Sequence, residues 1–305
     1  MPRLPPARLI ALDEPRRLML DLPARGGGMA VLEWGDPERP VDLVFVHANG
    51  FNAQTYRTLL APLADRFRIW APDLRGHGGT NLSTATEMRR GWGDHGEDIA
   101  AVLDAIDGPP VVLAGHSMGG TASLLAAETR PQRVRGLVLA DPVIWKRPIV
   151  LAFHLPVLRD LPRRSPLVTN ALKRRSRFDS GEAAFKAYQG RGAFKGWPDA
   201  VLRDYLEDGL VAADGGFDLA CAPEWEASNY ATHAHDPWRA MKRLTCPIHI
   251  LKAEAGLACH VPERPRGLPH VAVETVPDST HFLPMLQPEG VRGALGAMLE
   301  SADAA

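Results

Sequence analysis

Hydrophobic residues along this chain fall into two recurring patterns. Short apolar runs bounded by Gly, Pro or Asp are typical of buried strands, and longer segments with apolar residues every three or four positions are typical of helices. The predicted strands are residues 18–22, 29–34, 41–46, 67–71, 111–114, 134–140, 247–251 and 271–276. The predicted helices are residues 56–63, 96–106, 121–127 and 290–299. This alternation predicts an α/β fold with a mostly parallel central sheet, helices on both faces and an antiparallel edge formed by the first two strands.

The alternation stops after the sixth strand and resumes near residue 245. The intervening residues read mainly as helices, at 149–158, 166–173, 182–188 and 199–210. An insertion of this length after a core strand is typical of a cap over an active site. The predicted organisation is an α/β core of residues 1–142 and 245–305, with a mainly helical cap of residues 143–244. An independent small domain is the alternative, and the cap is favoured because the core pattern resumes afterwards.

The bulk composition narrows the class of protein. With 305 residues, 45% of them hydrophobic, and a net charge of −1, the chain fits one large domain with no bias toward nucleic acid. Its cysteines, Cys221, Cys246 and Cys259, form no Cys-x-x-Cys pair and favour reduced thiols in a cytoplasm. Neither the first residues nor the apolar run at 148–158 is long enough for a secretory or membrane-spanning segment. We expect a cytoplasmic protein without a nucleic-acid partner or a transmembrane segment, and a homodimer is compatible with the sequence.

One strand-to-helix junction carries the strongest chemical signal. The apolar run that begins at Val111 leads into Gly115-His116-Ser117-Met118-Gly119-Gly120, and a helical pattern follows. A serine on such a sharp turn needs small neighbours, and the glycines meet that need. Because the helix begins just after the serine, its free backbone N–H groups face any anion that develops there. Ser117 is therefore the candidate nucleophile, and it needs a base to take its proton.

Four motifs in order carry a family resemblance. They are Phe45-Val46-His47 after the third strand, Asp73-Leu74-Arg75-Gly76-His77-Gly78 after the fourth, the junction at Ser117, and Thr280-His281-Phe282 after the last strand. The chain resembles the α/β-hydrolase superfamily over roughly residues 17–142 and 245–300, as a capped member similar to serine esterases and lipases. The resemblance implies that His281 is the base and that His77 is a structural loop histidine. The fold alone does not identify a substrate.

The resemblance leaves two candidates for the acid that orients His281. Relatives most often place an aspartate after the seventh strand, where this chain has Gly256, with Glu254 two residues earlier. Other relatives place the acid at the end of the sixth strand, where this chain has Asp141. Asp141 could also be only a turn residue before Pro142. We take Asp141 as the acid and Glu254 as the second choice.

The resemblance also suggests how the site binds an oxyanion and a substrate. The oxyanion hole would consist of the N–H of Met118 and that of Asn49, with Gly50 or Phe51 as alternatives to Asn49. We expect His47, Phe51 and Trp145 to contact the substrate. The cap begins with nine Lys or Arg residues between positions 146 and 177, against a single acid, Asp160. This excess fits an anionic substrate, a membrane surface or an ordinary solvated face.

These residues predict a serine hydrolase that cleaves a small-molecule carboxylic ester through an acyl-enzyme intermediate, with no cofactor and no metal. His233 and His235 have a spacing that could suit a metal, but no third ligand is evident, and we expect them to be solvent-exposed loop histidines. A carbon–carbon bond hydrolase, a lactonase, or a cofactor-free lyase or haloperoxidase could use the same triad. A non-catalytic ligand-binding member is the alternative from another class.

Overall fold

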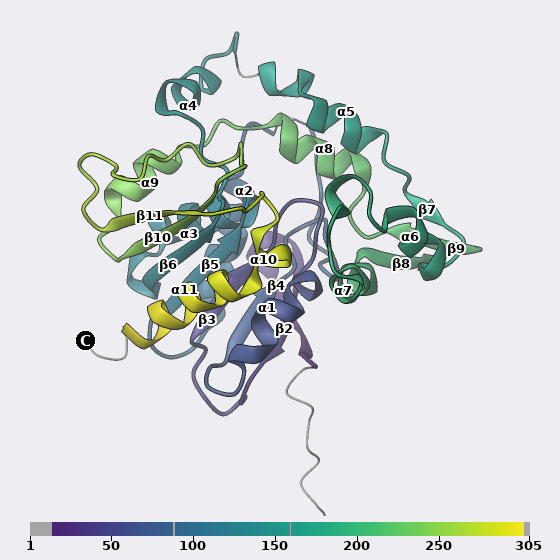
Figure 1. The fold of residues 1–305 in the computed structure, drawn as a ribbon, viewed down its shortest axis with the longest axis horizontal. Coiled ribbons are helices and arrows are strands. Elements are labelled where there is room, and N and C mark those ends of the chain that lie inside the picture. Colours follow the sequence, from purple (N-terminus) through teal and green to yellow (C-terminus); the bar gives the residue numbers. More distant parts are fainter. Residues whose placement is uncertain (1–13, 88, 159, 302–305) are drawn as a thin grey trace, which may run out of the picture.

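A computed structural model describes residues 14–87, 89–158 and 160–301, so the expectation about a secretory segment falls largely on residues outside this part. Eight strands form one sheet in the order β1-β2-β4-β3-β5-β6-β10-β11 (Figure 1). The strands are β1 (Arg16–Leu22), β2 (Gly27–Trp34), β3 (Leu43–Val46), β4 (Ile69–Pro72), β5 (Val111–His116), β6 (Val134–Ala140), β10 (Ile248–Ala253) and β11 (Val271–Val276). β2 pairs antiparallel with both β1 and β4, and the remaining pairs are parallel. The predicted mostly parallel sheet with an antiparallel edge is confirmed.

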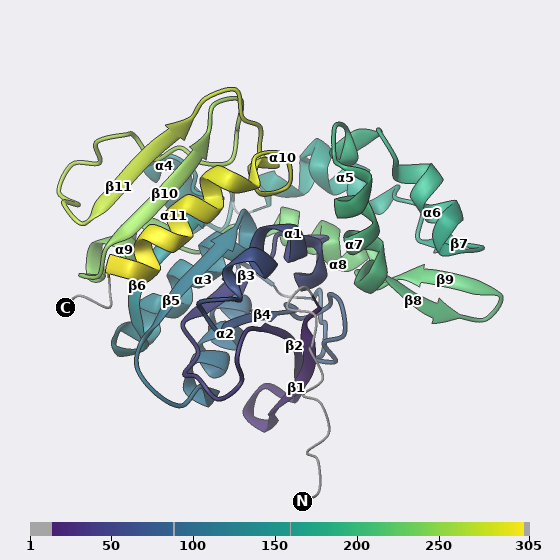
Figure 2. The same cartoon turned by 60° about the horizontal axis from the view of Figure 1, so that its bottom comes forward.

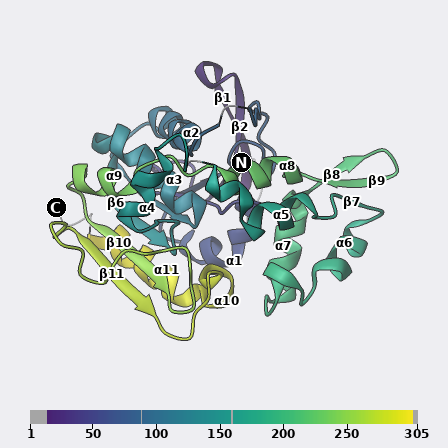
Figure 3. The ribbon, with the colours of Figure 1, turned by 90° about the horizontal axis from the view of Figure 1, so that it is seen from above.

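Helices cover both faces of the sheet, as predicted (Figure 3). One face carries α2 (Gly93–Ala105) and α3 (Met118–Thr129), and the other carries α1 (Arg57–Leu60), α10 (Leu283–Leu286) and α11 (Pro288–Ser301). Successive residues of a strand point to opposite faces. Thus Val44 and Val46 join the apolar cluster under α2 and α3, whereas Leu43 and Phe45 join the cluster under α1 and α11.

The insertion follows β6, as predicted, and in Figure 1 its helices α4 to α8 lie along the top and right of the molecule, whereas α9 lies at the left. Its helices are α4 (Arg147–Phe153), α5 (Pro166–Leu172), α6 (Gly181–Tyr188), α7 (Asp199–Gly209), α8 (Pro223–Ala231) and α9 (Pro237–Arg243). It also contains a small sheet that the sequence analysis missed, formed by β7 (Arg177–Phe178), β9 (Gly216–Leu219) and β8 (Leu210–Ala213). Figure 2 shows the β8–β9 hairpin at one edge. The register pairs Ala213 with Gly216, so Asp214-Gly215 forms a two-residue turn, and Asp-Gly is a strong hairpin signal.

The middle and the end of the insertion pack against different parts of the core. Phe178, Trp197 and Tyr205 extend the apolar cluster that lies under α1 and α11. In contrast, Ala240 and Met241 of α9 join the opposite cluster, and α9 packs against α3. The insertion is thus integrated into both core clusters, and the predicted cap boundary at residue 244 stays a prediction.

The described residues lack two kinds of feature, a membrane-spanning helix and a metal-binding cluster. None of the helices they form is both long and apolar enough to cross a membrane. Nor do the described residues contain a group of three or more His, Cys, Asp or Glu side chains arranged to hold a metal ion. All three cysteines are free thiols.

Candidate active site

Ser117 lies on a strained turn between β5 and α3. Its backbone has φ 56° and ψ −119°, a conformation that costs a non-glycine residue about 1–3 kcal/mol. The glycines around it make the turn sterically feasible. A Cβ atom on Gly115 would lie 2.6 Å from the carbonyl carbon of Gly119, and one on Gly119 would lie 2.3 Å from the carbonyl oxygen of His47. The start of α3 therefore packs directly against the loop that follows β3.

Three side chains from distant parts of the chain form a hydrogen-bonded line at this turn. Nε2 of His281 lies 2.9 Å from Oγ of Ser117, and Nδ1 of His281 lies 2.6 Å from Oδ2 of Asp141. Asp141 is fully buried, and its Oδ1 accepts the Ala253 N–H at 3.1 Å. Since a carboxylate only accepts, Nδ1 of His281 carries the proton and Nε2 is left to accept the Ser117 hydroxyl. The line can move a proton from Ser117 to His281.

The two candidate acids occupy different surroundings. The backbone of Asp141 has φ 39° at the end of β6, and its carboxylate points at His281. Glu254 is exposed on the far side of its loop, where its carboxylate accepts the N–H of Asp278 at 2.9 Å. A Cβ atom on Gly256 would lie 2.8 Å from Oδ2 of Asp141. The glycine at that position thus leaves room for the carboxylate that comes from β6.

Residues 47–52 after β3 form a buried segment, here called the oxyanion loop. Most of its backbone N–H groups donate hydrogen bonds. The Ala48 N–H donates to the Tyr56 hydroxyl at 3.0 Å, and the Gly50 N–H donates to Nε2 of His77 at 3.0 Å. The N–H of Phe51 donates to the carbonyl of Ala48 at 3.2 Å. Among the described residues, the N–H of Asn49 has no acceptor. Met118 is the first residue of α3, so its N–H has no acceptor within the helix. Asn49, rather than Gly50 or Phe51, therefore has a free N–H that could bind an oxyanion.

A chain of hydrogen bonds connects His281 to the oxyanion loop. Nε2 of His116 donates to the carbonyl of His281 at 2.7 Å, and the Tyr56 hydroxyl donates to Nδ1 of His116 at 2.7 Å. The same hydroxyl accepts the Ala48 N–H. Burial lowers the pKa of His116 well below its usual range and keeps the ring neutral, as this pattern requires. The backbones at His281 and Ala48 are thus held in one hydrogen-bonded framework.

The three residues expected to contact a substrate lie in different environments. His47 is fully buried: its Nδ1 lies 2.7 Å from the carbonyl of Ala48 and its Nε2 accepts the Leu74 N–H at 2.8 Å, so both ring nitrogens are engaged by backbone. Phe51 packs in an aromatic group with His116, Trp197, Tyr205 and Phe282 beside His281. Trp145 belongs to another aromatic group, formed with Phe153, His233 and His260.

One expectation about the insertion is wrong, and its basic start is only partly exposed. His233 and His235 are buried rather than exposed, and both pack on Trp92. Burial lowers the pKa of His233 to about 4. The basic start of the insertion is also not wholly a solvated face, because Arg174 turns inward to Glu226 at 2.8 Å.

Helix α8 was not anticipated, and it supplies residues that touch the oxyanion loop. Nδ2 of Asn49 donates to the Glu226 carbonyl at 3.0 Å, and Nδ2 of Asn229 donates to Oδ1 of Asn49 at 2.8 Å. Pro223 at the first helical position, with Glu224 and Glu226 in the first turn, is a helix-start signal that could have located α8.

The chain is similar to known proteins over most of its length. The chain is 26% identical over 250 residues to a 2-(acetamidomethylene)succinate hydrolase of Mesorhizobium japonicum, covering 81% of this chain and 84% of that protein. It is 28% identical over 283 residues to the magnesium-chelatase 30 kDa subunit of Rhodobacter capsulatus, covering 88% and 90%.

A solved structure of an E-2-(acetamidomethylene)succinate hydrolase has the same fold, with a TM-score of 0.75 at 23% identity over 94% of this chain and 100% of the other. A sequence model of the alpha/beta hydrolase family matches residues 43–294, which include the strained serine, His281 and Asp141. The chain therefore belongs to the alpha/beta hydrolase family.

Proposed function

We propose that this hydrolase cleaves carboxylic esters through an acyl-enzyme intermediate on Ser117. The observation that carries the proposal is the line from Ser117 through His281 to Asp141, with heavy-atom distances of 2.9 and 2.6 Å. These distances are within the hydrogen-bond reach that nucleophile activation needs. The strained turn supports it, because strain of this kind is characteristic of functional sites.

In the acylation step, the Ser117 oxygen bonds to the ester carbonyl carbon while its proton moves to Nε2 of His281. Asp141 holds the imidazole in the required tautomer and stabilises the imidazolium that forms. The carbonyl oxygen becomes an oxyanion and accepts hydrogen bonds from the free N–H groups of Met118 and Asn49. The tetrahedral intermediate collapses when the carbon–alkoxide bond breaks and the leaving alcohol takes the proton from His281.

Deacylation repeats these steps with water as the nucleophile. His281 takes a proton from the water as its oxygen bonds to the acyl carbon, and it returns that proton to Ser117 as the acid leaves. No step requires a cofactor. Phe51 and its aromatic neighbours provide an apolar wall for an acyl chain beside His281. The free thiols fit a cytoplasmic location.

Substitution of the nucleophile tests this function. We expect Ser117→Ala to lower turnover of p-nitrophenyl esters of rising chain length by at least about 10⁴-fold and to abolish fluorophosphonate labelling. Ser123→Ala is the matched control, because Ser123 is a buried serine of α3, the helix that begins directly after Ser117, and its Oγ donates to the Ala114 carbonyl at 3.2 Å. A Ser117→Ala protein with full esterase turnover would exclude the mechanism.

A second candidate is hydrolysis of an amide-type bond in a small carboxylate-bearing substrate. It is favoured by the likeness to a protein named for 2-(acetamidomethylene)succinate, which spans most of both chains. The same nucleophile and oxyanion hole would act on the amide carbonyl. Assaying 2-(acetamidomethylene)succinate beside the ester panel distinguishes the two, since the preferred substrate has the higher kcat/KM.

A further inference from the structure

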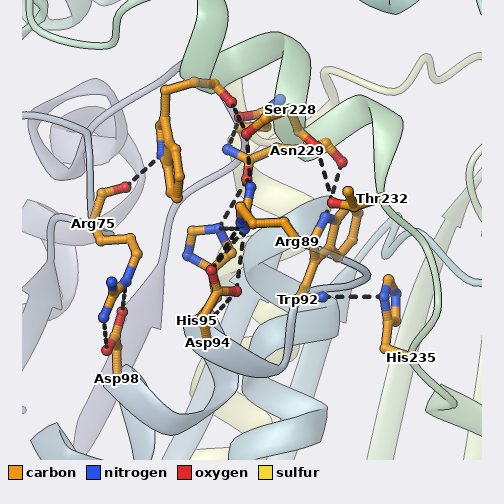
Figure 4. Close-up of polar contacts among 12 residues, drawn as sticks. Arg75, Arg89, Trp92, Asp94, His95, Asp98, Ser228, Asn229, Thr232 and His235 are labelled. Atoms are coloured by element: carbon orange, nitrogen blue, oxygen red, sulfur yellow. Dashed lines mark hydrogen bonds and ion pairs between the residues drawn. The ribbon is translucent and has the colours of Figure 1, made fainter. Parts of the chain in front are cut away.

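Helix α8 lies outside the proposed triad, yet a polar network joins it to Arg89 and the start of α2 (Figure 4), and Asn229 of this network also bonds to Asn49 of the oxyanion loop. We propose that Asn229 of α8 is a positioning residue that fixes the orientation of Asn49, and through it the N–H that binds the oxyanion. The inference rests on the proposed function. It assigns part of the insertion a role in transition-state stabilisation that neither the triad nor the elbow motif contains.

The side chain of Asn49 is clamped from two sides by α8. Its Oδ1 accepts Nδ2 of Asn229 at 2.8 Å, and its Nδ2 donates to the carbonyl of Glu226 at 3.0 Å. Asn229 is fully buried and Asn49 is 6% exposed, so water does not compete for these bonds. A carboxamide held at both ends restricts rotation about its own side-chain bonds and, with Ala48 and Gly50 anchored on either side, restricts the backbone that carries the free N–H.

The orientation of Asn229 is itself determined by its neighbours. Its Oδ1 lies 2.7 Å from Nη1 of Arg89 and 3.0 Å from Nε2 of His95. Because an arginine only donates, Oδ1 must face Arg89, and Nδ2 must then face Asn49. Nδ1 of His95 has no partner among the described residues, which fits a neutral ring, and its Nε2 lies 3.3 Å from Nη2 of Arg89 as well as 3.0 Å from Oδ1 of Asn229. Burial lowers the pKa of His95 and favours this neutral form.

Arg89 and α8 are fixed in turn to the core. Arg89 pairs with Asp94 in the first turn of α2 at 2.9 Å and stacks over the Trp225 ring at 4.1 Å. Nε1 of Trp225 donates to the Arg75 carbonyl at 2.8 Å. A Cβ atom on Gly76 would lie 2.4 Å from the Trp225 ring, so this glycine of the loop after β4 makes room for α8. Through these contacts, the core fixes the position of α8 and thereby that of the Asn49 side chain.

The experiment compares Asn229→Asp and Asn229→Ala with Ser228→Ala. Asn229→Asp keeps the acceptor for Arg89 but removes the donor to Asn49. Ser228 is the matched control, because its Oγ also accepts from Arg89, at 2.8 Å, but it is not bonded to Asn49. Each variant is measured for kcat, KM, affinity for a trifluoromethyl ketone and thermal midpoint. Asn49→Ala and the Asn49→Ala/Asn229→Ala double variant complete a cycle.

We expect both Asn229 variants to lower kcat and trifluoromethyl ketone affinity about tenfold, with KM changed by less than about twofold, because only transition-state binding is lost. Ser228→Ala should keep wild-type kcat. The double variant should be no slower than Asn49→Ala alone, because Asn229 acts through Asn49.

Unchanged kcat in a folded Asn229→Asp protein, or additive losses in the cycle, would overturn the inference. If Asn229→Ala does not fold, Asn229→Asp and the Ser228→Ala comparison still decide it. Fluorophosphonate labelling of the wild type separates this failure from failure of the proposed function. A wild-type protein that is neither labelled nor active contradicts the proposed function, whereas a labelled wild type with fully active Asn229 variants contradicts only this inference.

Discussion

The two loops that meet at Ser117 are built in opposite ways. The oxyanion loop, residues 47–52, is buried along its whole length and is anchored by Tyr56, His77 and Asn229. The loop that carries His281, residues 277–282 and here called the base loop, is more exposed: Ser279 is its one buried residue, and the His281 side chain itself is 31% exposed. It is held by Asp141, by the bond from His116 to the His281 carbonyl, and by bonds that join Ser279 and Asp278 to residues 254 and 255.

The difference follows from what each loop does in the proposed reaction. An oxyanion donor stabilises developing charge best when its dipole is fixed beforehand and water is excluded. The base must accept and return protons, and in deacylation it must meet a water molecule. The oxyanion loop is therefore the more buried and rigid of the two, whereas the base loop lets water reach His281.

The largest expected effect concerns the acid that orients the base loop. Asp141→Asn should lower kcat by about 10⁴-fold, because an amide no longer enforces the tautomer of His281 or stabilises its charged form. Glu254→Gln should stay within about twofold of wild type, since within the described part of the chain its carboxylate bonds only to the Asp278 N–H. Initial rates on the best p-nitrophenyl ester measure both. The opposite ranking would assign the role to Glu254.

Moving the carboxylate sharpens this test. The Cβ atom that Gly256 lacks would lie 2.8 Å from Oδ2 of Asp141. We expect Asp141→Ala/Gly256→Asp to be at least about tenfold faster than Asp141→Ala, because the carboxylate then approaches His281 from the neighbouring strand. Equal rates for the two variants would mean that the site accepts an acid only from β6.

A steric change in the oxyanion loop should have the next largest effect. Gly50 has φ 75°, and a Cβ atom there would lie 2.8 Å from Oε1 of Glu226, whose carboxylate is held by Arg174. We expect Gly50→Ala to lower kcat by about 10²-fold, the loss typical of one oxyanion donor. Gly267→Ala is the matched control, because Gly267 has φ 74° but nothing within 4 Å of its added Cβ. Equal losses in the two variants would point to backbone strain alone.

Tyr56 connects the two loops, and its removal should affect both. Tyr56→Phe leaves the Ala48 N–H without an acceptor and Nδ1 of His116 without a donor, both in buried positions. We expect the free energy of unfolding to fall by about 1–3 kcal/mol, measured by urea denaturation followed by circular dichroism. Tyr188→Phe, which loses one bond to Arg174 at 3.2 Å, should cost less. A Tyr56→Phe protein as stable as wild type would show that the framework does not hold the loops.

The last expected effect is the pH dependence of stability. Burial lowers the pKa of seven histidines: His47 and His233, each to about 4, and His77, His95, His116, His235 and His260. Because these rings are neutral when folded and take up protons on unfolding, stability should fall as pH drops from about 6.5 to about 4. Asp73 and Asp204, whose pKa values burial raises to about 7 and about 6, act in the opposite direction. Urea midpoints at pH 7.5, 6 and 5 should decrease in that order. Midpoints that rise in that order would show that the histidines do not dominate the pH dependence.

Particular residues explain how far the sequence alone could go. The strands and the junction at Ser117 were predictable, because apolar runs and glycine positions report local backbone needs. Pairing Ser117 with His281 required the resemblance, since 164 residues separate them. The bond from Asn229 to Asn49 was beyond reach, because no local pattern reports which buried amide a helix will touch. The hairpin at Asp214-Gly215 and the start of α8 at Pro223 were missed although their signals are local.

By itself, the sequence determined the mostly parallel sheet, the position of the insertion after β6 and the presence of a serine turn at residue 117. These depend on short-range rules of periodicity, glycine conformation and element order. Only the tertiary structure decided that Asp141 rather than Glu254 reaches His281 and that Asn49 has the free N–H. It also decided that α8 clamps that residue. The physical reason is that each of these is a hydrogen bond, or the absence of one, between groups distant in the chain, and such bonds form only once the strands and the insertion are packed together.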